Sequence, residues 1–434
     1  MTTLKNSIGL RLGIIAVVTL VLLIPALMIQ SLISERQQRR NEAISDVFDK
    51  WGNVQTVSGP ILSVPYKTVI KYKEGHTQTV KNFAHLLPDQ LNVKGKVNPE
   101  VRYRGIYETV LYNSKINIYG NFSPREINSL NIPEQDILWD EAFVSIGITD
   151  MKGIKELIKL KWNNDEVITN PGIPTIDVLQ SGVSARVNVK ESDKFNFNFN
   201  INLNGSESIF FTPLGKETKV NLNSDWNTPS FAGQYLPASR NITESSFSAE
   251  WSILHLNRNY PQVWLGNSHQ INQSAFGVTL LIPVDEYQKT MRTAKYAIMF
   301  IALTFITFFM MELLNKKTIH PLQYLLIGFA LLIFYSLLLA VSEHLLFNYA
   351  YLISGLLIIF LITAYTRSVL KSNLHSLLIA GILTMLYSYL FIILQLQDYA
   401  LLMGSIGLFL ILALVMYLTR KVDWFSIMQT DKNR

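Results

Sequence analysis

The chain has 434 residues, of which 49% are hydrophobic, and a formal net charge of +6. Residues 35–292 carry 27 basic and 27 acidic side chains, so the surplus lies entirely in the more apolar remainder, as in the loops of a membrane protein rather than on a nucleic-acid-binding face. The absence of cysteine excludes disulfide frameworks, thiol catalysis and cysteine-ligated zinc.

The first apolar run, residues 12–33, reads "LGIIAVVTLVLLIPALMIQSLI". About 20 apolar residues are needed to cross the hydrocarbon core of a bilayer. The run is longer than the apolar core of about 7–15 residues in a cleavable signal peptide, and no small-residue cleavage site follows it. We therefore predict a cytoplasmic segment at 1–11 and an uncleaved transmembrane helix at 12–33.

Residues 34–295 are polar and mixed, and we predict that they form one large, mainly antiparallel β domain. The stretch "KFNFNFNINLNGS", Lys194–Ser206, alternates apolar residues with asparagine, which is the period of a strand with one buried face. Its last three residues predict a turn. Helical patterns are confined to Ser34–Trp51 and Met151–Leu160. Further strands are expected at "GPILSVPY", "VRYRGIYETVLY", "KINIYGNF", "AFVSIGIT", "GVSARVNV", "SIFFTPLG", "ETKVNLNSDW" and "FGVTLLIPV".

The segment "SDWNTPSFAGQY" within this domain is rich in aromatic residues. Its Trp226 and Phe231 form a binding face in one interpretation and part of the core in the other. Large aromatic side chains contribute most when buried with a polar group directed outward, so core packing is the preferred interpretation.

Five further apolar runs follow in a block at 296–418, and a cytoplasmic tail is expected at 419–434. Connections between the runs are short, so neighbouring helices are expected to be antiparallel. The predicted fold is therefore an α + β membrane protein with six transmembrane helices and a mainly β domain, outside the membrane, inserted between helices 1 and 2; the family resemblance described below implies that this domain is periplasmic. The five runs are 296–314, 322–341, 345–365, 374–394 and 399–418.

Basic residues near the ends of these runs predict the orientation, because lysine and arginine are enriched in short cytoplasmic loops. With the N-terminus inside, four clusters fall on the cytoplasmic side, whereas the two outer turns contain Glu343 and Asp398. Both termini are thus predicted to be cytoplasmic. The clusters are Lys5 with Arg11, Lys316 with Lys317, Arg367 with Lys371, and Arg420 with Lys421.

No phosphate-binding loop, zincin helix, nucleophile elbow or kinase signature is present. We therefore expect no enzymatic activity, cofactor or metal. The most prominent ionisable pair in the membrane block is Glu343 with His344, for which a functional charge and simple solvation of a helix end are the two interpretations.

Several stretches resemble the CreD family of bacterial inner-membrane proteins over nearly the whole chain. In the membrane block they are "AKYAIMFIALTFITFFMMELL", "IHPLQYLLIGFALLIFYSLLLAVSEH" and "RKVDWFS"; outside it they are "SGPILSVPY", "RGIYETVLY", "SDWNTPSFAGQYLP" and "PVDEYQ". The family's usual "SDWPHPSF" is changed here at Asn227 and Thr228.

The most specific stretch of this resemblance contains most of the candidate functional residues, namely His320, Pro321, Gln323, Tyr324, Glu343 and His344. The resemblance implies a Gram-negative inner-membrane protein with a role in cell-envelope integrity, associated with the Cre two-component regulon, colicin tolerance and β-lactam stress. It supplies no catalytic residue.

Three functional hypotheses follow: a non-enzymatic envelope protein, a transporter or channel formed by the helices, and a sensor that relays periplasmic stress. We expect contact with the lipid bilayer and with a periplasmic or membrane protein that the sequence does not name, and no contact with nucleic acid. The sequence leaves the oligomeric state open.

Overall fold

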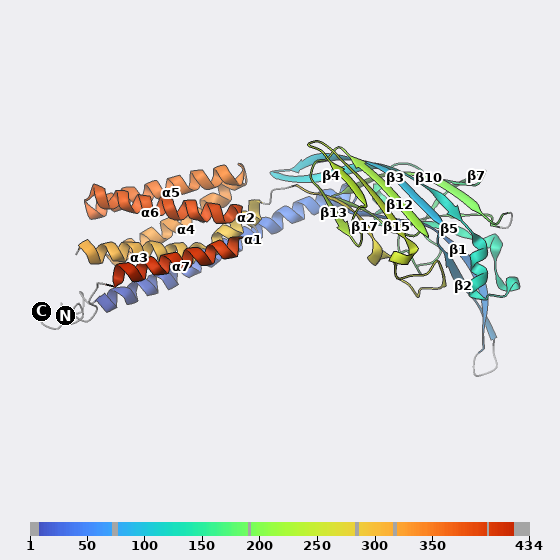
Figure 1. The fold of residues 1–434 in the computed structure, drawn as a ribbon, viewed down its shortest axis with the longest axis horizontal. Coiled ribbons are helices and arrows are strands. Elements are labelled where there is room, and N and C mark those ends of the chain that lie inside the picture. Colours follow the sequence, from blue (N-terminus) through green and yellow to red (C-terminus); the bar gives the residue numbers. More distant parts are fainter. Residues whose placement is uncertain are drawn as a thin grey trace. The chain divides into compact units, whose positions relative to one another are not determined.

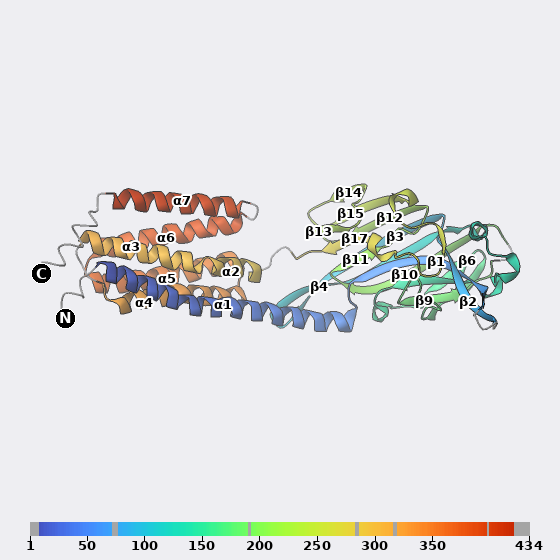
Figure 2. The ribbon, with the colours of Figure 1, turned by 90° about the horizontal axis from the view of Figure 1, so that it is seen from below.

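The computed structural model describes residues 8–71, 77–189, 192–282, 286–315, 319–396 and 399–420. The chain divides into two units, which are described separately below (Figure 1, Figure 2). The helical unit comprises Met1–Asn41 and Val284–Arg434, and the β-rich unit comprises Glu42–Pro283. The predicted domain at 34–295 is wider than the β-rich unit because its two ends are helical.

Helix α1 (Ile8–Trp51) is a single helix of 44 residues. At 1.5 Å per residue it is about 66 Å long, more than twice the thickness of a hydrocarbon core. Its polar part is supported by pairs at i,i+4 spacing, such as Glu35 with Arg39 and Asp46 with Lys50. The helical pattern predicted at 34–51 is therefore the continuation of the first apolar helix.

Six further helices are described in the helical unit: α2 (Glu286–Lys295), α3 (Ala297–Asn315), α4 (Pro321–Ser342), α5 (Phe347–Leu370), α6 (Asn373–Gln395) and α7 (Ala400–Thr419). Within the described residues, α1, α4, α5 and α6 are each long and apolar enough to cross a membrane, and α2 with α3, bent by 43°, adds a fifth span if counted as one. The sequence did not predict α2. The count of six spans, which includes α7, stays a prediction.

Aromatic side chains pack three of these helices together. Phe334 of α4 lies edge-on to Tyr387 of α6, with ring centroids 4.7 Å apart, and to Tyr351 of α5 at 5.4 Å. The Tyr351 hydroxyl donates to the Tyr387 carbonyl at 2.8 Å. A buried tyrosine needs such a partner for its hydroxyl, so this cluster fixes the packing of α4, α5 and α6.

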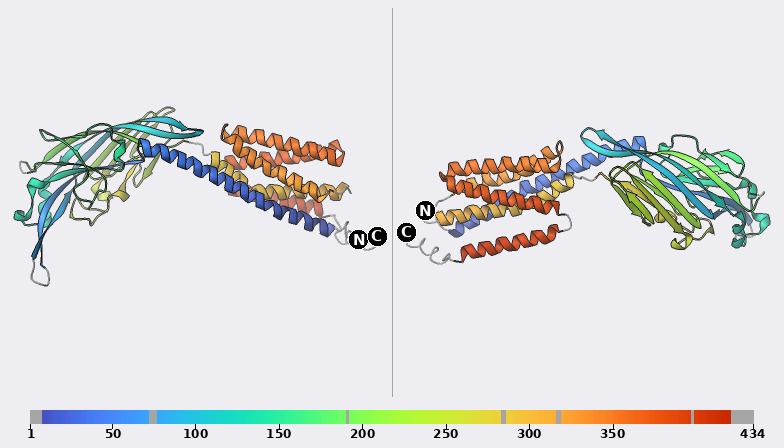
Figure 3. Two further views of the ribbon diagram at one scale, coloured as in Figure 1. Left: turned by 180° about the vertical axis from the view of Figure 1, so that it is seen from behind. Right: turned by 45° about the horizontal axis from the view of Figure 1, so that its top comes forward.

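The β-rich unit consists of two sheets whose inner faces share one hydrophobic core (Figure 1, Figure 3). The nine-stranded sheet runs β13 (Pro229–Gly233), β17 (Phe276–Leu280), β11 (Ser208–Phe211), β1 (Gln55–Lys71), β5 (Phe143–Ile148), β9 (Gly182–Arg186), β8 (Asn170–Pro171), with β2 (Thr77–Leu86) on β1 and β16 (Val263–Leu265) on β2. The eight-stranded sheet runs β14 (Ser239–Ile242), β15 (Phe247–Leu254), β12 (Glu217–Ser224), β3 (Gln90–Arg104), β4 (Tyr107–Phe122), β10 (Phe195–Ser206), β6 (Lys159–Trp162), β7 (Asp165–Ile168).

Most strand pairs are antiparallel, as predicted, but β1 with β11 and β12 with β3 are parallel. Short 3-10 helices occupy Pro124–Leu130, Glu134–Asp136, Trp139–Glu141, Met151–Gly153, His255–Asn257 and Asn272–Ser274.

Strand β10 confirms the prediction made from alternation, since its apolar residues are buried and most of the intervening asparagines are not. The predicted turn at Asn204–Ser206 is wrong. These three residues remain in β10, where they are in register with Asn113, Tyr112 and Leu111 of β4, and the chain turns at Glu207, whose φ is 55°. Pairing along a long neighbouring strand outweighs the local turn preference.

Two other sequence expectations differ from the structure. The stretch Met151–Leu160 is a short 3-10 turn followed by the start of β6, because Leu160 and Trp162 are buried in the core between exposed lysines. The stretch "VRYRGIYETVLY" is a hairpin rather than one strand, and the chain reverses at Gly105, whose positive φ of 62° suits glycine.

Candidate functional site

Three of the candidate residues build the start of α4. The imidazole Nδ1 of His320 accepts a hydrogen bond from the Leu322 amide at 3.2 Å, and the Gln323 side chain accepts one from the His320 amide at 2.9 Å. This reciprocal arrangement is a capping box, and Pro321 suits the first helical position because it has no N–H to satisfy there. His320, Pro321 and Gln323 thus have a structural role in starting the helix.

Tyr324, one turn further, belongs to a buried polar cluster. Its hydroxyl donates to Glu312 Oε2 at 3.2 Å, and Glu312 Oε1 lies 2.6 Å from Nη1 of Arg11. Glu312 is 6% exposed, so its charge depends on these partners. One carboxylate of α3 therefore binds both α1 and α4. Sequence reasoning missed this cluster because Arg11 and Glu312 are 301 positions apart.

The capping residues and this cluster line one cavity of about 560 Å³ in the helical unit. Its lining residues are Leu10, Arg11, Ile14, Ile15, Glu312, Ile319, His320, Pro321, Gln323 and Tyr324. The structure thus brings together four of the residues that the sequence singled out.

Glu343 and His344 are not brought together in this way. Glu343 Oε1 accepts a hydrogen bond from the Tyr287 hydroxyl at 3.0 Å and lies 4.0 Å from Nε of Arg36. His344 is exposed, and no bond between its side chain and Glu343 is found in the part of the chain that the structure describes. Glu343 therefore connects α4 to α1 and α2.

The geometry of Phe231 and Trp226 favours core packing over a binding face. The Phe231 ring lies edge-on to those of Phe247 and Trp251, at 5.8 and 5.7 Å. Trp226 is partly buried against the same core, and its indole N–H is enclosed without an acceptor among the described residues.

A serine, a histidine and an aspartate form a hydrogen-bonded chain that the sequence did not reveal. Ser63 Oγ lies 2.9 Å from Nδ1 of His85, and His85 Nε2 lies 3.2 Å from Oδ2 of Asp177. Ser63 and His85 are only 2% and 1% exposed, so a substrate cannot reach the serine oxygen in this arrangement. The chain ties β1 and β2 to the segment that precedes β9.

Because His85 is buried, we expect the β-rich unit to lose stability in acid. Burial lowers the pKa of His85 below its ordinary value of 6.5, and the hydrogen bond to Asp177 opposes that shift. The unfolded chain therefore takes up the proton at higher pH than the folded one, and unfolding is favoured as pH falls below about 6.5. Melting curves of the full-length protein from about pH 8 to 5 test this. An equal loss of stability in His85→Gln would contradict it.

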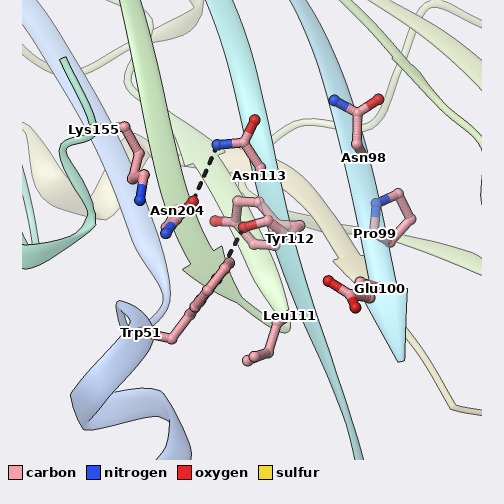
Figure 4. A pocket seen from close by; sticks show the side chains of 9 residues that line it. All are labelled: Trp51, Asn98, Pro99, Glu100, Leu111, Tyr112, Asn113, Lys155 and Asn204. Atoms are coloured by element: carbon pink, nitrogen blue, oxygen red, sulfur yellow. Dashed lines mark hydrogen bonds between the residues drawn. The ribbon is translucent and has the colours of Figure 1, made fainter. Parts of the chain in front are cut away.

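A second cavity, of about 430 Å³, lies within the β-rich unit beside the end of α1 (Figure 4). The Trp51 indole N–H donates to the Tyr112 carbonyl at 3.2 Å, which fixes the orientation of the ring. Asn113 Nδ2 donates to Asn204 Oδ1 at 3.0 Å and to Asn202 Oδ1 at 2.7 Å. The lining residues are Trp51, Asn98, Pro99, Glu100, Leu111, Tyr112, Asn113, Lys155 and Asn204.

Sequence reasoning did not identify this pocket. It treated the asparagines of β10 as the solvent side of a strand and gave them no role. Asparagine is a poor strand former, so its recurrence at alternate positions from Asn196 to Asn204 was the available signal.

Comparison with known proteins agrees with the earlier resemblance. The family model described as "Inner membrane protein CreD" matches residues 7–425. Inner membrane protein CreD of Escherichia coli (strain K12) is 32% identical over 434 residues, which cover 98% of this chain and 95% of that protein. The match thus includes both the apolar helices and the β-rich unit, and we conclude that the chain belongs to the CreD family of inner-membrane proteins.

Proposed function

We propose that this protein supports the integrity of the cell envelope as a six-pass inner-membrane protein, and that its β-rich unit binds an envelope component in the periplasm without catalysing a reaction. The observation that carries the proposal is the chain order. The β-rich unit begins within the polar end of α1, after its apolar part, and precedes α2 and the apolar helices after it, so both of its ends continue into the helical unit.

The distribution of basic residues supports the periplasmic placement. Arg11 near the start of α1, Arg367 in the last turn of α5 and Arg420 after α7 fall on one side when successive helices are antiparallel. Lys5, Lys316, Lys317, Lys421 and Asp398, which entered the same argument from sequence, lie outside the described residues.

A binding role is supported by the kind of polar sites that the β-rich unit offers. Its nearest approach to a catalytic arrangement, Ser63 with His85 and Asp177, is enclosed and connects structural elements. Its open pocket beside Trp51 is instead lined by amides, two aromatic residues and two charged residues, which are groups that recognise a ligand. The transporter hypothesis loses the support of the Glu343–His344 pair, because Glu343 is bound to Tyr287 rather than to His344.

The placement can be tested directly because the chain has no cysteine. Ser245 and Asn373 are exposed and uncharged, so Ser245→Cys and Asn373→Cys form a matched pair. We expect a membrane-impermeant maleimide to label Ser245→Cys in intact spheroplasts and Asn373→Cys only after lysis. The reverse pattern would overturn the orientation.

Envelope function is tested by deleting the gene and measuring sensitivity to detergent, colicins and β-lactams. We expect a changed sensitivity that the intact gene restores. Unaltered sensitivity in every assay would contradict the proposal.

A further inference from the structure

We propose that the pocket beside Trp51, together with the polar surface next to it, binds a glycan that carries carboxylate groups. This inference rests on the proposed periplasmic placement and names the class of ligand. The surface, called the asparagine face below, consists of outward residues of β3, β4 and β10: Asn92, Lys94, Lys96, Asn98, Asn113, Lys115, Asn117, Asn198, Asn200, Asn202 and Asn204.

The asparagine face is ordered by its own hydrogen bonds. Asn117 lies opposite both Lys94 and Asn200 in the register of the sheet. Its Nδ2 donates to Asn198 Oδ1 and Asn200 Oδ1, both at 2.8 Å. In these bonds the β10 amides accept through their side-chain oxygen atoms. Side chains held in this way lose little conformational entropy when a ligand binds.

Within the pocket, one amide donor has no protein acceptor. Asn204 is 5% exposed, and its Oδ1 accepts from Asn113. No acceptor for its Nδ2 is found among the described residues, although the neighbouring Asn202 donates through Nδ2 to Glu156 at 2.8 Å. Because Asn204 lines the cavity and its Nδ2 is not enclosed by protein atoms, a ligand oxygen in the pocket can accept a hydrogen bond from it.

The aromatic wall of the pocket favours a sugar ring as that ligand. Trp51 is partly exposed and is fixed by its hydrogen bond to Tyr112 (Figure 4). It packs against the buried residues Ile44, Phe48 and Leu111. A pyranose has an apolar C–H face, which stacks on an indole, and a rim of hydroxyls, which need partners able both to donate and to accept. Amide side chains provide both functions.

The charges of the face favour carboxylates on the glycan. Lys94 and Lys115 on the sheet and Lys155 at the pocket have no acidic partner within 4 Å among the described residues, whereas Lys96 lies 3.2 Å from Asp225. The acidic residue of the pocket, Glu100, is already paired with Arg102 at 2.8 Å. An anionic chain would therefore meet uncompensated positive charge along the face.

The test uses the full-length protein in nanodiscs at low salt, with calorimetry as the measurement. One probe is a hyaluronan hexasaccharide, in which N-acetylglucosamine alternates with glucuronate, and the other is the neutral N-acetylglucosamine hexamer. We expect the anionic probe to bind at least about 5-fold more tightly, which corresponds to about 1 kcal/mol. Equal affinities would overturn the assignment of carboxylates, and absence of binding by both probes at millimolar concentration would overturn the site.

Two substitutions localise the site. Asn204→Asp keeps the oxygen that Asn113 binds and replaces the free N–H₂ by a negative oxygen, and Trp51→Ala removes the stacking surface. We expect each to weaken binding of the anionic probe at least about 10-fold. The control is Asn241→Asp, the same change at an exposed position of β14, which we expect to leave affinity within about 2-fold.

Trp51→Tyr keeps an aromatic ring and is expected to retain most of the affinity. It therefore still tests the role of the ring if Trp51→Ala does not fold. Undiminished binding by Asn204→Asp would overturn the inference. The proposed function is judged separately: if Asn204→Asp loses binding yet fully restores envelope resistance to the deletion strain, the glycan is not the functional ligand, although the envelope role stands.

Discussion

Replacing Arg11 by alanine is expected to destabilise the helical unit by about 3–5 kcal/mol. The Arg11 guanidinium lies 2.6 Å from Glu312, which is almost fully buried and also accepts from Tyr324. Removing the cation leaves a carboxylate enclosed among helices without its counter-charge, and such a charge is much more costly than the loss of an exposed pair. Thermal melting of the purified protein in nanodiscs is the measurement.

The matched control is Arg39→Ala on the same helix, whose pair with Glu35 is exposed at both residues. We expect it to leave the melting temperature nearly unchanged. Glu312→Gln removes the charge but keeps the shape, so the double variant with Arg11→Ala should recover part of the lost stability. Equal effects of Arg11→Ala and Arg39→Ala would show that the buried pair does not hold these helices.

Replacing Trp251 by alanine is expected to destabilise the β-rich unit by about 3–5 kcal/mol. This indole is fully buried, its ring centroid lies 5.7 Å from that of Phe231 and 5.6 Å from that of Phe276, and its N–H donates to the Tyr235 carbonyl at 3.2 Å. Alanine leaves a cavity beside the rings of Phe231 and Phe276. Denaturant unfolding of the full chain, followed by near-ultraviolet circular dichroism, measures the loss.

Trp251→Phe separates the two contributions, because phenylalanine fills most of the space but cannot donate to Tyr235. We expect it to lose about 1–2 kcal/mol, the cost of an unpaired acceptor and a small void. If Trp251→Ala were no more destabilising than Trp251→Phe, the packing role assigned to Trp251, and with it the core role of Phe231, would be wrong.

Membership of the CreD family identifies this chain as an inner-membrane protein. The polar residues in the family-like stretch at the start of α4 have structural explanations, since His320, Pro321 and Gln323 cap the helix and Tyr324 binds Glu312. The open and chemically varied site lies instead in the β-rich unit, beside Trp51. Experiments on ligand recognition are therefore best directed at that unit.

Features that depend on local periodicity could be predicted from the sequence. Runs of about 20 apolar residues predicted helices such as α4 and α6, and alternation along β10 predicted which residues face the core. Both signals are contained in a window of a few residues, because burial of one face needs only a regular spacing of apolar side chains.

Contacts between distant residues became known only from the folded structure. The turn expected at Asn204–Ser206 is part of a strand because these residues pair with β4. The stretch Met151–Leu160 is not an α-helix, because burial of Leu160 in the core requires the start of strand β6 there. The pairing of Arg11 with Glu312, the chain from Ser63 through His85 to Asp177, and the pocket between Trp51 and Asn204 join segments far apart in sequence. Such contacts depend on the packing of whole elements, and no local spacing encodes them.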